Sequence, residues 1–99
     1  MTALIGKVAL IVGNGNPEQR AVAVALAESG ADLAIGGSAG TEEVLLHSIA
    51  NEIWAMGRRS LVAGLVGEDA ATFATVAGKV RGELGRLDLV VRVEPVLAS

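Results

Sequence analysis

Short apolar runs alternate along this chain with longer segments in which apolar residues recur three or four positions apart. The run over residues 7–12, KVALIV, carries apolar side chains on both faces. That pattern is typical of an interior strand in a parallel sheet and not of a half-exposed strand. Similar β-rich runs predict four strands in all, over residues 7–12, 32–35, 60–63 and 87–93.

The first segment between strands begins with signals for a helix N-terminus. Asn16 is predicted to be the N-cap, and Pro17 suits the first helical position. Gln19 stands at the third helical position, where the side chain of a capping box bonds back to the backbone N–H of the N-cap residue. Gly30 is predicted to follow the end of this helix, as a glycine in the C′ position.

Two further helices are predicted in the same way. Acidic residues open the second, where they complement the helix dipole, and Gly57 ends it. Asp69 is predicted to cap the third, and Gly85 to end it. The predicted apolar faces are Leu45, Ile49 and Ile53 on the second helix and Phe73, Val76, Val80 and Leu84 on the third.

This alternation of strands and helices predicts an α/β fold. Right-handed crossovers place the helices on the two faces of one parallel sheet, as a three-layer α/β/α arrangement. The expected architecture is Rossmann-like, with four parallel strands in the order 3-2-1-4. Ligands bind such sheets where the strand order reverses, here between the first and fourth strands. A length of 99 residues limits this chain to one module, residues 1–99.

Composition narrows the possible chemistry. The chain has no cysteine and one histidine, His47, so it has no thiolate nucleophile and no basis for a cysteine- or histidine-rich metal site. The net charge is −3, and the basic residues form no stripe, which argues against nucleic acid as a partner. No apolar run approaches the roughly 20 residues that span a bilayer. We therefore expect a cytoplasmic protein without a membrane or metal partner.

Several segments, in order and at consistent intervals, resemble the short-chain dehydrogenase/reductase (SDR) family. The similarity extends through most of the chain and covers the N-terminal Rossmann half of that family. The segments that carry it are residues 6–13 (GKVALIVG), 20–23 (RAVA), 26–31 (LAESGA), 57–59 (GRR) and 85–91 (GRLDLVV).

The resemblance implies a cofactor turn made of Thr, Gly, three free residues, and two glycines separated by one residue. Here Val12 stands at the Thr position, Gly13 is retained, and Pro17 and Gln19 replace the two later glycines. Glycine is needed there so that the backbone can approach a pyrophosphate and donate its N–H groups. Pro17 removes one donor, and Glu18 adds negative charge beside an anionic ligand. The cofactor turn is therefore degenerate.

Other positions of the family's site also differ. The resemblance implies a charged residue after the second strand, an Asp after the third and an Asn-Asn-Ala-Gly turn after the fourth. Residues 36–38, 64–67 and 92–95 have none of these. The chain contains no tyrosine, so the family's catalytic Tyr and Lys pair has no counterpart. We therefore assign no catalytic residue and expect no enzyme activity from this chain on its own, while a role within an enzyme complex stays open.

Three interpretations follow. The favoured one is a non-catalytic SDR-like subunit, a pseudoenzyme, with a structural or partner-binding role and no expected cofactor. The second is a module that binds NAD(P), a nucleotide or another anion within an SDR-type oxidoreductase complex, through a nest of N–H groups. Truncation of an SDR oxidoreductase is the third, although truncation would not by itself alter the cofactor motifs in the retained half. The candidate cofactor-binding residues are Gly13, Asn14, Gly15 and Asn16.

The fourth predicted strand is the main argument for a partner. An apolar edge strand has unpaired backbone groups and invites pairing with another chain. We expect a homo-oligomer or a complex with a full-length SDR-like protein. Alternatively, Arg92, Glu94 and Pro95 only discourage aggregation at this edge. The candidate interface residues are Leu89, Val91, Val93 and Trp54.

Overall fold

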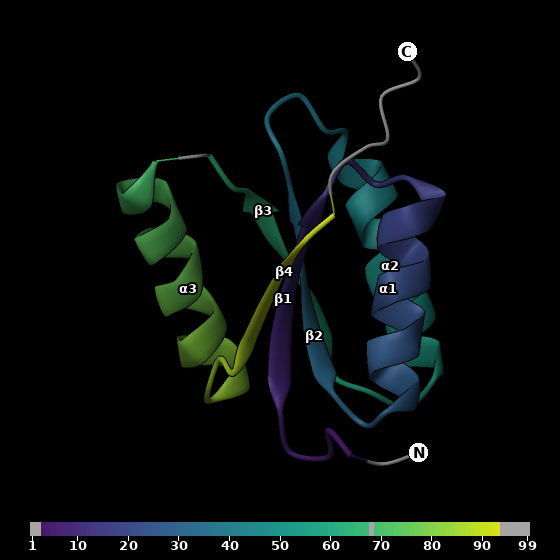
Figure 1. Cartoon of the computed structure of the whole chain (residues 1–99). Helices are drawn as coiled ribbons and strands as arrows, with labels where there is room; N and C mark the ends of the chain where they lie inside the picture. The colour runs from purple at the N-terminus through teal and green to yellow at the C-terminus, as the bar shows by residue number, and fades with distance from the viewer. Residues whose placement is uncertain (1–2, 68, 94–99) are drawn as a thin grey trace.

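The computed structural model of this chain describes residues 3–67 and 69–93. Its elements alternate along the chain as predicted, and three helices pack against one sheet (Figure 1). The strands are β1 (Val8–Gly13), β2 (Asp32–Gly37), β3 (Ser60–Leu65) and β4 (Leu89–Arg92), and the helices are α1 (Pro17–Glu28), α2 (Glu43–Ala55) and α3 (Ala70–Leu84).

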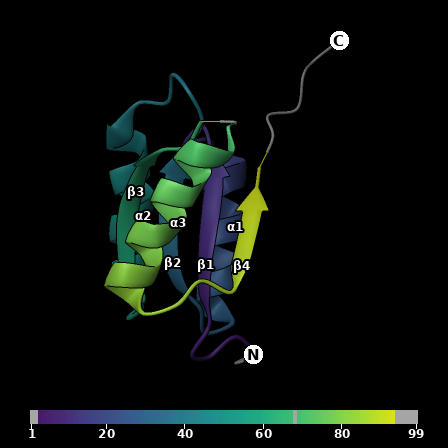
Figure 2. The same cartoon turned by 90° about the vertical axis from the view of Figure 1, so that its left-hand side faces the viewer.

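The strand order is β3-β2-β1-β4, and every pair of neighbours is parallel. This confirms the predicted Rossmann-like sheet and places β1 at its centre. Helices α1 and α2 cover one face, and α3 covers the other (Figures 1 and 2). The carboxyl ends of β1 and β4 therefore flank the point where the strand order reverses, which is the usual ligand crevice of such sheets.

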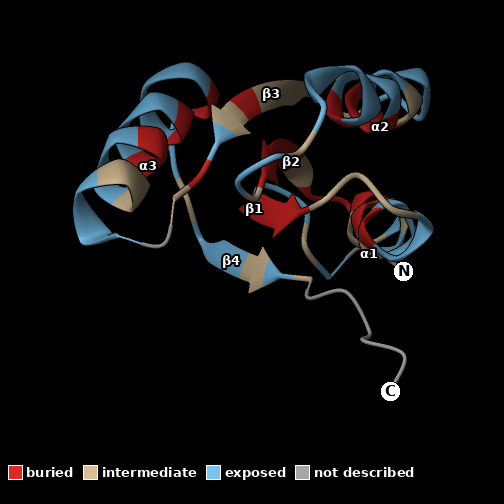
Figure 3. Cartoon of the chain, turned by 90° about the horizontal axis from the view of Figure 1, so that it is seen from above, coloured by how far each residue is buried: buried red, intermediate tan, exposed pale blue. Residues whose placement is uncertain are grey.

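Strand β1 is buried on both faces, as its sequence predicts (Figure 3). Ala9 and Ile11 belong to the apolar cluster beneath α1 and α2. Leu10 and Val12 belong to the separate cluster beneath α3. The first cluster also contains Ala23 and Ala27 of α1, which have no exposed surface. These small side chains allow α1 to lie close to the sheet.

The first three strands end one or two residues later than predicted, β1 also begins one residue later, and β4 is shorter. Strands β1, β2 and β3 end at Gly13, Gly37 and Leu65, because the ladder between neighbours continues through the glycines. Strand β4 covers only Leu89–Arg92. Leu87 and Asp88, which were predicted to begin this strand, lie outside it. The Asp88 side chain accepts the Val8 N–H at 2.9 Å.

Most predicted helix ends are confirmed. Asn16 and Asp69 cap α1 and α3 with their side chains. Glycines with positive φ follow the three helices at positions 30, 57 and 85. On the predicted face of α2, Ile49 and Ile53 are buried as expected, but Leu45 is wrong: it is 42% exposed, and Leu46 and Ala50 are buried instead. The buried stripe of α2 therefore begins one position later than expected.

Two arginines cap helices to which they do not belong. Arg58 Nε donates to the Ala27 carbonyl in the last turn of α1 at 2.9 Å. Arg59 Nη2 donates to the Leu84 carbonyl of α3 at 3.0 Å, and its Nε pairs with Asp32. Positive charge at helix C-termini is favourable, and although both arginines follow α2 in the sequence, the helices they serve are α1 and α3.

Within residues 3–67 and 69–93, no helix is long and apolar enough to cross a membrane. The same residues contain no cluster of three or more acidic or histidine side chains suited to a metal ion. Glu94 and Pro95, named above as possible edge protectors, lie outside the described residues.

Candidate functional site

The candidate site is the turn between β1 and α1, at the carboxyl end of the central strand. Of the four candidate residues, Gly13 ends β1, and Asn14, Gly15 and Asn16 form the turn itself. Gly15 has φ +81°, a conformation that residues with a Cβ rarely adopt. The turn directs the chain into α1, whose N-terminus would attract an anion through its dipole and unpaired N–H groups.

Asparagine side chains bond the amide groups of this turn. Asn14 Oδ1 accepts the Asn16 N–H at 3.1 Å. Asn16 Oδ1 accepts the Gln19 N–H at 2.9 Å, which confirms the predicted cap. Two N–H groups that could have faced an anion are thus bonded within the chain, and Pro17 at the start of α1 has none to offer.

The Gln19 side chain lies under the turn and joins three elements. It is fully buried, with no exposed surface. Its Oε1 accepts the Gly15 N–H at 2.7 Å, while Nε2 donates to the carbonyls of Ile11 on β1 at 3.0 Å and Gly36 on β2 at 2.9 Å. The expected return bond to Asn16 is therefore wrong: the side chain points inward, because two strand carbonyls accept its amide protons there.

The same side chain explains why position 13 remains glycine. A Cβ added at Gly13 would lie 2.9 Å from the Gln19 Cδ atom, closer than side chains approach one another. Gly13 and Gln19 are therefore a matched pair, in which the absence of one side chain accommodates the other. The family's third glycine position is occupied here by a side chain that fills the space beneath the turn.

The segment after β2 folds over the β1 carboxyl end. The Ser38 N–H donates to the Gly13 carbonyl at 2.9 Å. The hydroxyls of Ser38 and Thr41 lie 3.5 and 3.4 Å from the same oxygen. These contacts hold the 38–41 segment against the turn and use its polar groups internally.

Leu45, the residue that departs from the predicted α2 face, contacts the turn instead. A Cβ added at Gly15 would lie 2.5 Å from the Leu45 Cβ. The Leu45 side chain thus packs against Gly15, the glycine whose N–H donates to Gln19 Oε1. Glu18 in the first turn of α1 is exposed and acidic. Leu45 and Glu18 therefore place an apolar and a negatively charged side chain beside the turn, and neither is favourable for a phosphate.

The candidate interface residues are in other places. Leu89, Val91 and Val93 lie on or next to β4, which pairs only with β1 among the described strands. Leu89 is 38% exposed, whereas Val93 packs partly against the cluster beneath α1 and α2. Trp54 is 69% exposed at the C-terminal end of α2. It lines a hollow of about 270 Å³ with Gly57, Arg58 and Arg59, away from both β4 and the turn.

Sequence reasoning missed the central role of Gln19. The available signal was a polar, uncharged residue at a position where the family has glycine. An amide that both donates and accepts can bond strand carbonyls and a turn N–H together. His47 is exposed on α2 and lies outside this site.

Comparison with known proteins agrees with the fold. No protein-family model matches the chain. An uncharacterised oxidoreductase of Mycobacterium tuberculosis is 39% identical over 92 residues, which are 92% of this chain and 34% of that protein. The chain spans about a third of the length of the curated relatives it matches.

Solved structures show the same partial correspondence. A short-chain type dehydrogenase/reductase from Mycobacterium marinum superposes with a TM-score of 0.71 at 29% identity, over 90% of this chain and 35% of that one. Carveol dehydrogenase from Mycobacterium avium, in complex with NAD, gives 0.78 at 27% identity, over 91% and 36%. The chain is therefore related to the short-chain dehydrogenases/reductases and corresponds to the N-terminal Rossmann half of their fold.

Proposed function

We propose that this chain is a non-catalytic SDR-like module with a structural or partner-binding role, and that its first turn does not hold NAD(P). The observation that carries the proposal is the buried Gln19 side chain. It bonds Gly15 N–H, Ile11 carbonyl and Gly36 carbonyl at once. The family's way of binding a pyrophosphate needs free backbone amides and space at this place.

The cost of opening the turn supports this proposal. A pyrophosphate that took the Gly15 amide would leave the buried Gln19 oxygen without its donor. Losing the partner of a buried polar group costs about 1–3 kcal/mol. Repulsion from Glu18 and the missing N–H of Pro17 add to this cost. The residues of the turn therefore do not fit a dinucleotide bound in the family's manner.

The proposal that the chain has no activity of its own rests on its side chains. The sequence has no tyrosine, so the Tyr and Lys pair implied by the resemblance is absent from these 99 residues. Oxidoreductase activity in the relatives belongs to proteins about three times as long. Any contribution to hydride transfer would need residues from another chain or segment.

Two alternatives have specific support. Binding of NAD(P) or another nucleotide within an oxidoreductase complex is favoured by the similarity to carveol dehydrogenase, which was solved with NAD. A fragment of an SDR oxidoreductase is favoured by the alignments, which span only about a third of each relative. Both alternatives require the turn to accept a nucleotide once further residues are present.

A thermal-shift titration tests the proposal. The purified chain is melted with NAD(H) and NADP(H) up to millimolar concentrations, and sodium chloride at equal ionic strength is the control. A ligand that binds only the folded state stabilises it by RT ln(1 + [L]/Kd), about 2.7 kcal/mol at 100 times Kd. We expect no shift beyond the salt control. A saturable, nucleotide-specific rise in Tm would overturn the proposal.

A further inference from the structure

The turn between β1 and α1 contains an Asn-Gly pair. Asn14 precedes Gly15, and no other asparagine in the sequence is followed by glycine. An asparagine side chain can be attacked by the backbone nitrogen of the next residue, and glycine makes this attack easiest because it has no Cβ in the way. Asn16 precedes Pro17, which has no amide proton to give up and so cannot react by this route. Asn14 is therefore the asparagine with the greatest intrinsic reactivity.

Deamidation at this pair has two steps. The Gly15 nitrogen bonds to the carbonyl carbon of the Asn14 side chain, and the Gly15 amide proton leaves with the side-chain nitrogen as ammonia. The product is a five-membered succinimide ring. Water then opens the ring at either of its carbonyls, which gives aspartate or isoaspartate at position 14. Both products carry a new negative charge, and isoaspartate also lengthens the main chain of the turn by one carbon.

The folded chain holds both reacting groups in other bonds. The Gly15 N–H donates to Gln19 Oε1 at 2.7 Å, and the Gln19 side chain is fully buried. The succinimide nitrogen carries no proton, so formation of the ring would leave this buried oxygen without its donor. The attacked side chain is bonded as well, because Asn14 Oδ1 accepts the Asn16 N–H at 3.1 Å. The native turn therefore opposes the reaction of its own Asn-Gly pair.

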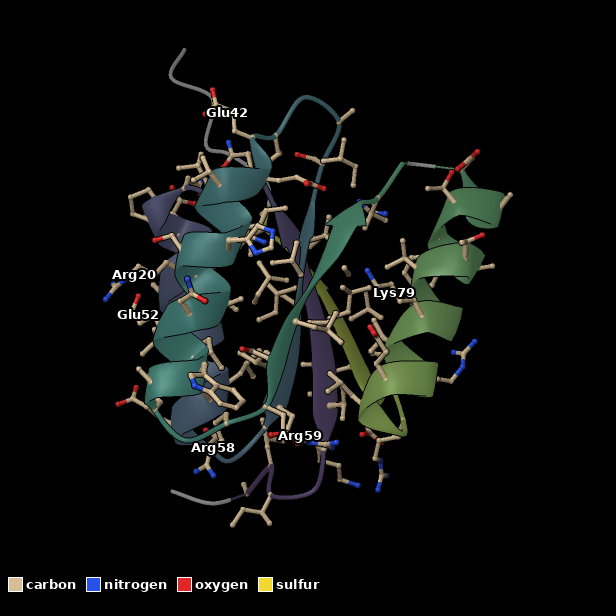
Figure 4. All side chains as sticks on the ribbon, turned by 180° about the vertical axis from the view of Figure 1, so that it is seen from behind. Arg20, Glu42, Glu52, Arg58, Arg59 and Lys79 are labelled. Atoms are coloured by element: carbon tan, nitrogen blue, oxygen red, sulfur yellow. The ribbon has the colours of Figure 1, made fainter. Side chains whose placement is uncertain are left out.

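Packing around the turn limits its opening. Leu45 of α2 lies against Gly15, where an added Cβ would be 2.5 Å from the Leu45 Cβ. Helix α1, which begins directly after the turn, is joined to α2 by the ion pair between Arg20 and Glu52 (Figure 4). The Gln19 amide is itself bonded to carbonyls of β1 and β2. Breaking the Gly15 bond therefore requires a shift of a turn that is fixed to both α2 and the sheet.

We propose that Asn14 is a deamidation site that the buried Gln19 side chain protects in the folded chain. Reaction then requires local opening of the turn, and its rate is the rate in the open turn multiplied by the open fraction. Leaving a buried acceptor without its donor lowers that fraction by about 5- to 150-fold. Gln19 thus has an effect beyond filling the space beneath the turn, because it keeps the neighbouring Asn-Gly pair from reacting.

The test is incubation of the purified 99-residue chain in mildly alkaline buffer, followed by peptide mass spectrometry that assigns each deamidated asparagine. The same chain unfolded in guanidinium chloride, at the same pH and temperature, gives the unprotected rate. We expect Asn14 to react at least about 5-fold more slowly in the folded chain than in the unfolded one. Asn16 and Asn51 are internal references and should react slowly in both, because neither precedes a glycine.

Two variants separate the Gly15 bond from general stability. Gln19→Met removes the acceptor of the Gly15 N–H and should raise the Asn14 rate of the folded chain by about 5-fold or more. Val80→Ala is the matched control, because it leaves a cavity in the separate apolar cluster beneath α3 and keeps Gln19 in place. The Val80→Ala chain should react at the wild-type rate. Circular dichroism checks that both variants are folded.

Equal Asn14 rates in the folded and unfolded wild type would overturn the proposal, as would an unfolded chain that does not react at Asn14. A folded Gln19→Met chain that reacts no faster than the wild type would also overturn it, and so would an equal increase in Val80→Ala. If Gln19→Met does not fold, hydrogen exchange of the wild type replaces it. The Gly15 amide should then be protected, and exchange at the rate of an unstructured amide would contradict the role of Gln19.

Discussion

Replacing Gln19 by Met removes the polar bonds beneath the turn and keeps a side chain of similar size. Three hydrogen bonds are lost, to the Ile11 and Gly36 carbonyls and from the Gly15 N–H. A typical intramolecular hydrogen bond contributes about 1 kcal/mol to stability, so the expected loss is about 3 kcal/mol. Volume-conserving replacement keeps the packing cost small. This loss is a large fraction of the roughly 5–15 kcal/mol by which domains are stable.

The assay is urea unfolding of Gln19→Met followed by far-ultraviolet circular dichroism, with the free energy of unfolding taken from linear extrapolation. Asn51→Met is the control, because Asn51 is an exposed polar residue in a helix interior. It should change the free energy of unfolding by no more than about 0.5 kcal/mol. A loss below about 1 kcal/mol for Gln19→Met would refute the reasoning. Water would then satisfy the three backbone groups as well as the amide does.

Three further predictions concern the parts around the site. The pKa of Asp88 lies below its ordinary value, chiefly because Arg86 donates to its carboxylate and also because the Val8 N–H does. A lowered pKa in the folded state gives stability that is present above the ordinary value of about 3.9 and is lost as pH falls through the folded-state pKa. The urea midpoint of the wild type should therefore fall more steeply below about pH 4 than that of Asp88→Asn, and equal slopes would contradict this. Gly15→Ala should destabilise the chain more than Gly57→Ala. Both glycines have positive φ and share a strain of about 1–2 kcal/mol, but only at Gly15 does the new Cβ meet Leu45. Equal urea midpoints for the two variants would argue against the Leu45 contact. Ala23→Leu should cost about 1–3 kcal/mol because Ala23 is fully buried between α1 and the sheet. Differential scanning calorimetry would show this as a lower Tm, and an unchanged Tm would mean that α1 does not lie close to β1.

Sequence patterns predicted the fold well, because the signals concerned are local. Asn16 and Asp69 cap helices through bonds to residues three positions away, so the spacing in the sequence already contains both partners. The glycine that follows each helix is local in the same sense. The strand order needed only the alternation of elements and the handedness of crossovers.

The site was less predictable, because its contacts join residues that are distant in sequence. Gln19 occupies the returning position of a capping box, and sequence alone favours the local bond. Its true acceptors include Gly36, which β1–β2 pairing brings within reach. Arg58 and Arg59 likewise follow α2 but bond the ends of α1 and α3. Such choices depend on which carbonyls lie nearby after the layers pack.

The sequence by itself therefore determined the kind, order and caps of the elements, the parallel sheet with β1 at its centre, and the replacement of two glycines in the first turn. Tertiary structure decided what those replacements do. Strand pairing places two strand carbonyls beneath the turn, and the Gln19 amide fills the space between them. Packing of α2 turns Leu45 onto Gly15. Both outcomes depend on long-range burial, which removes water from polar groups and so makes their partners a property of the folded chain.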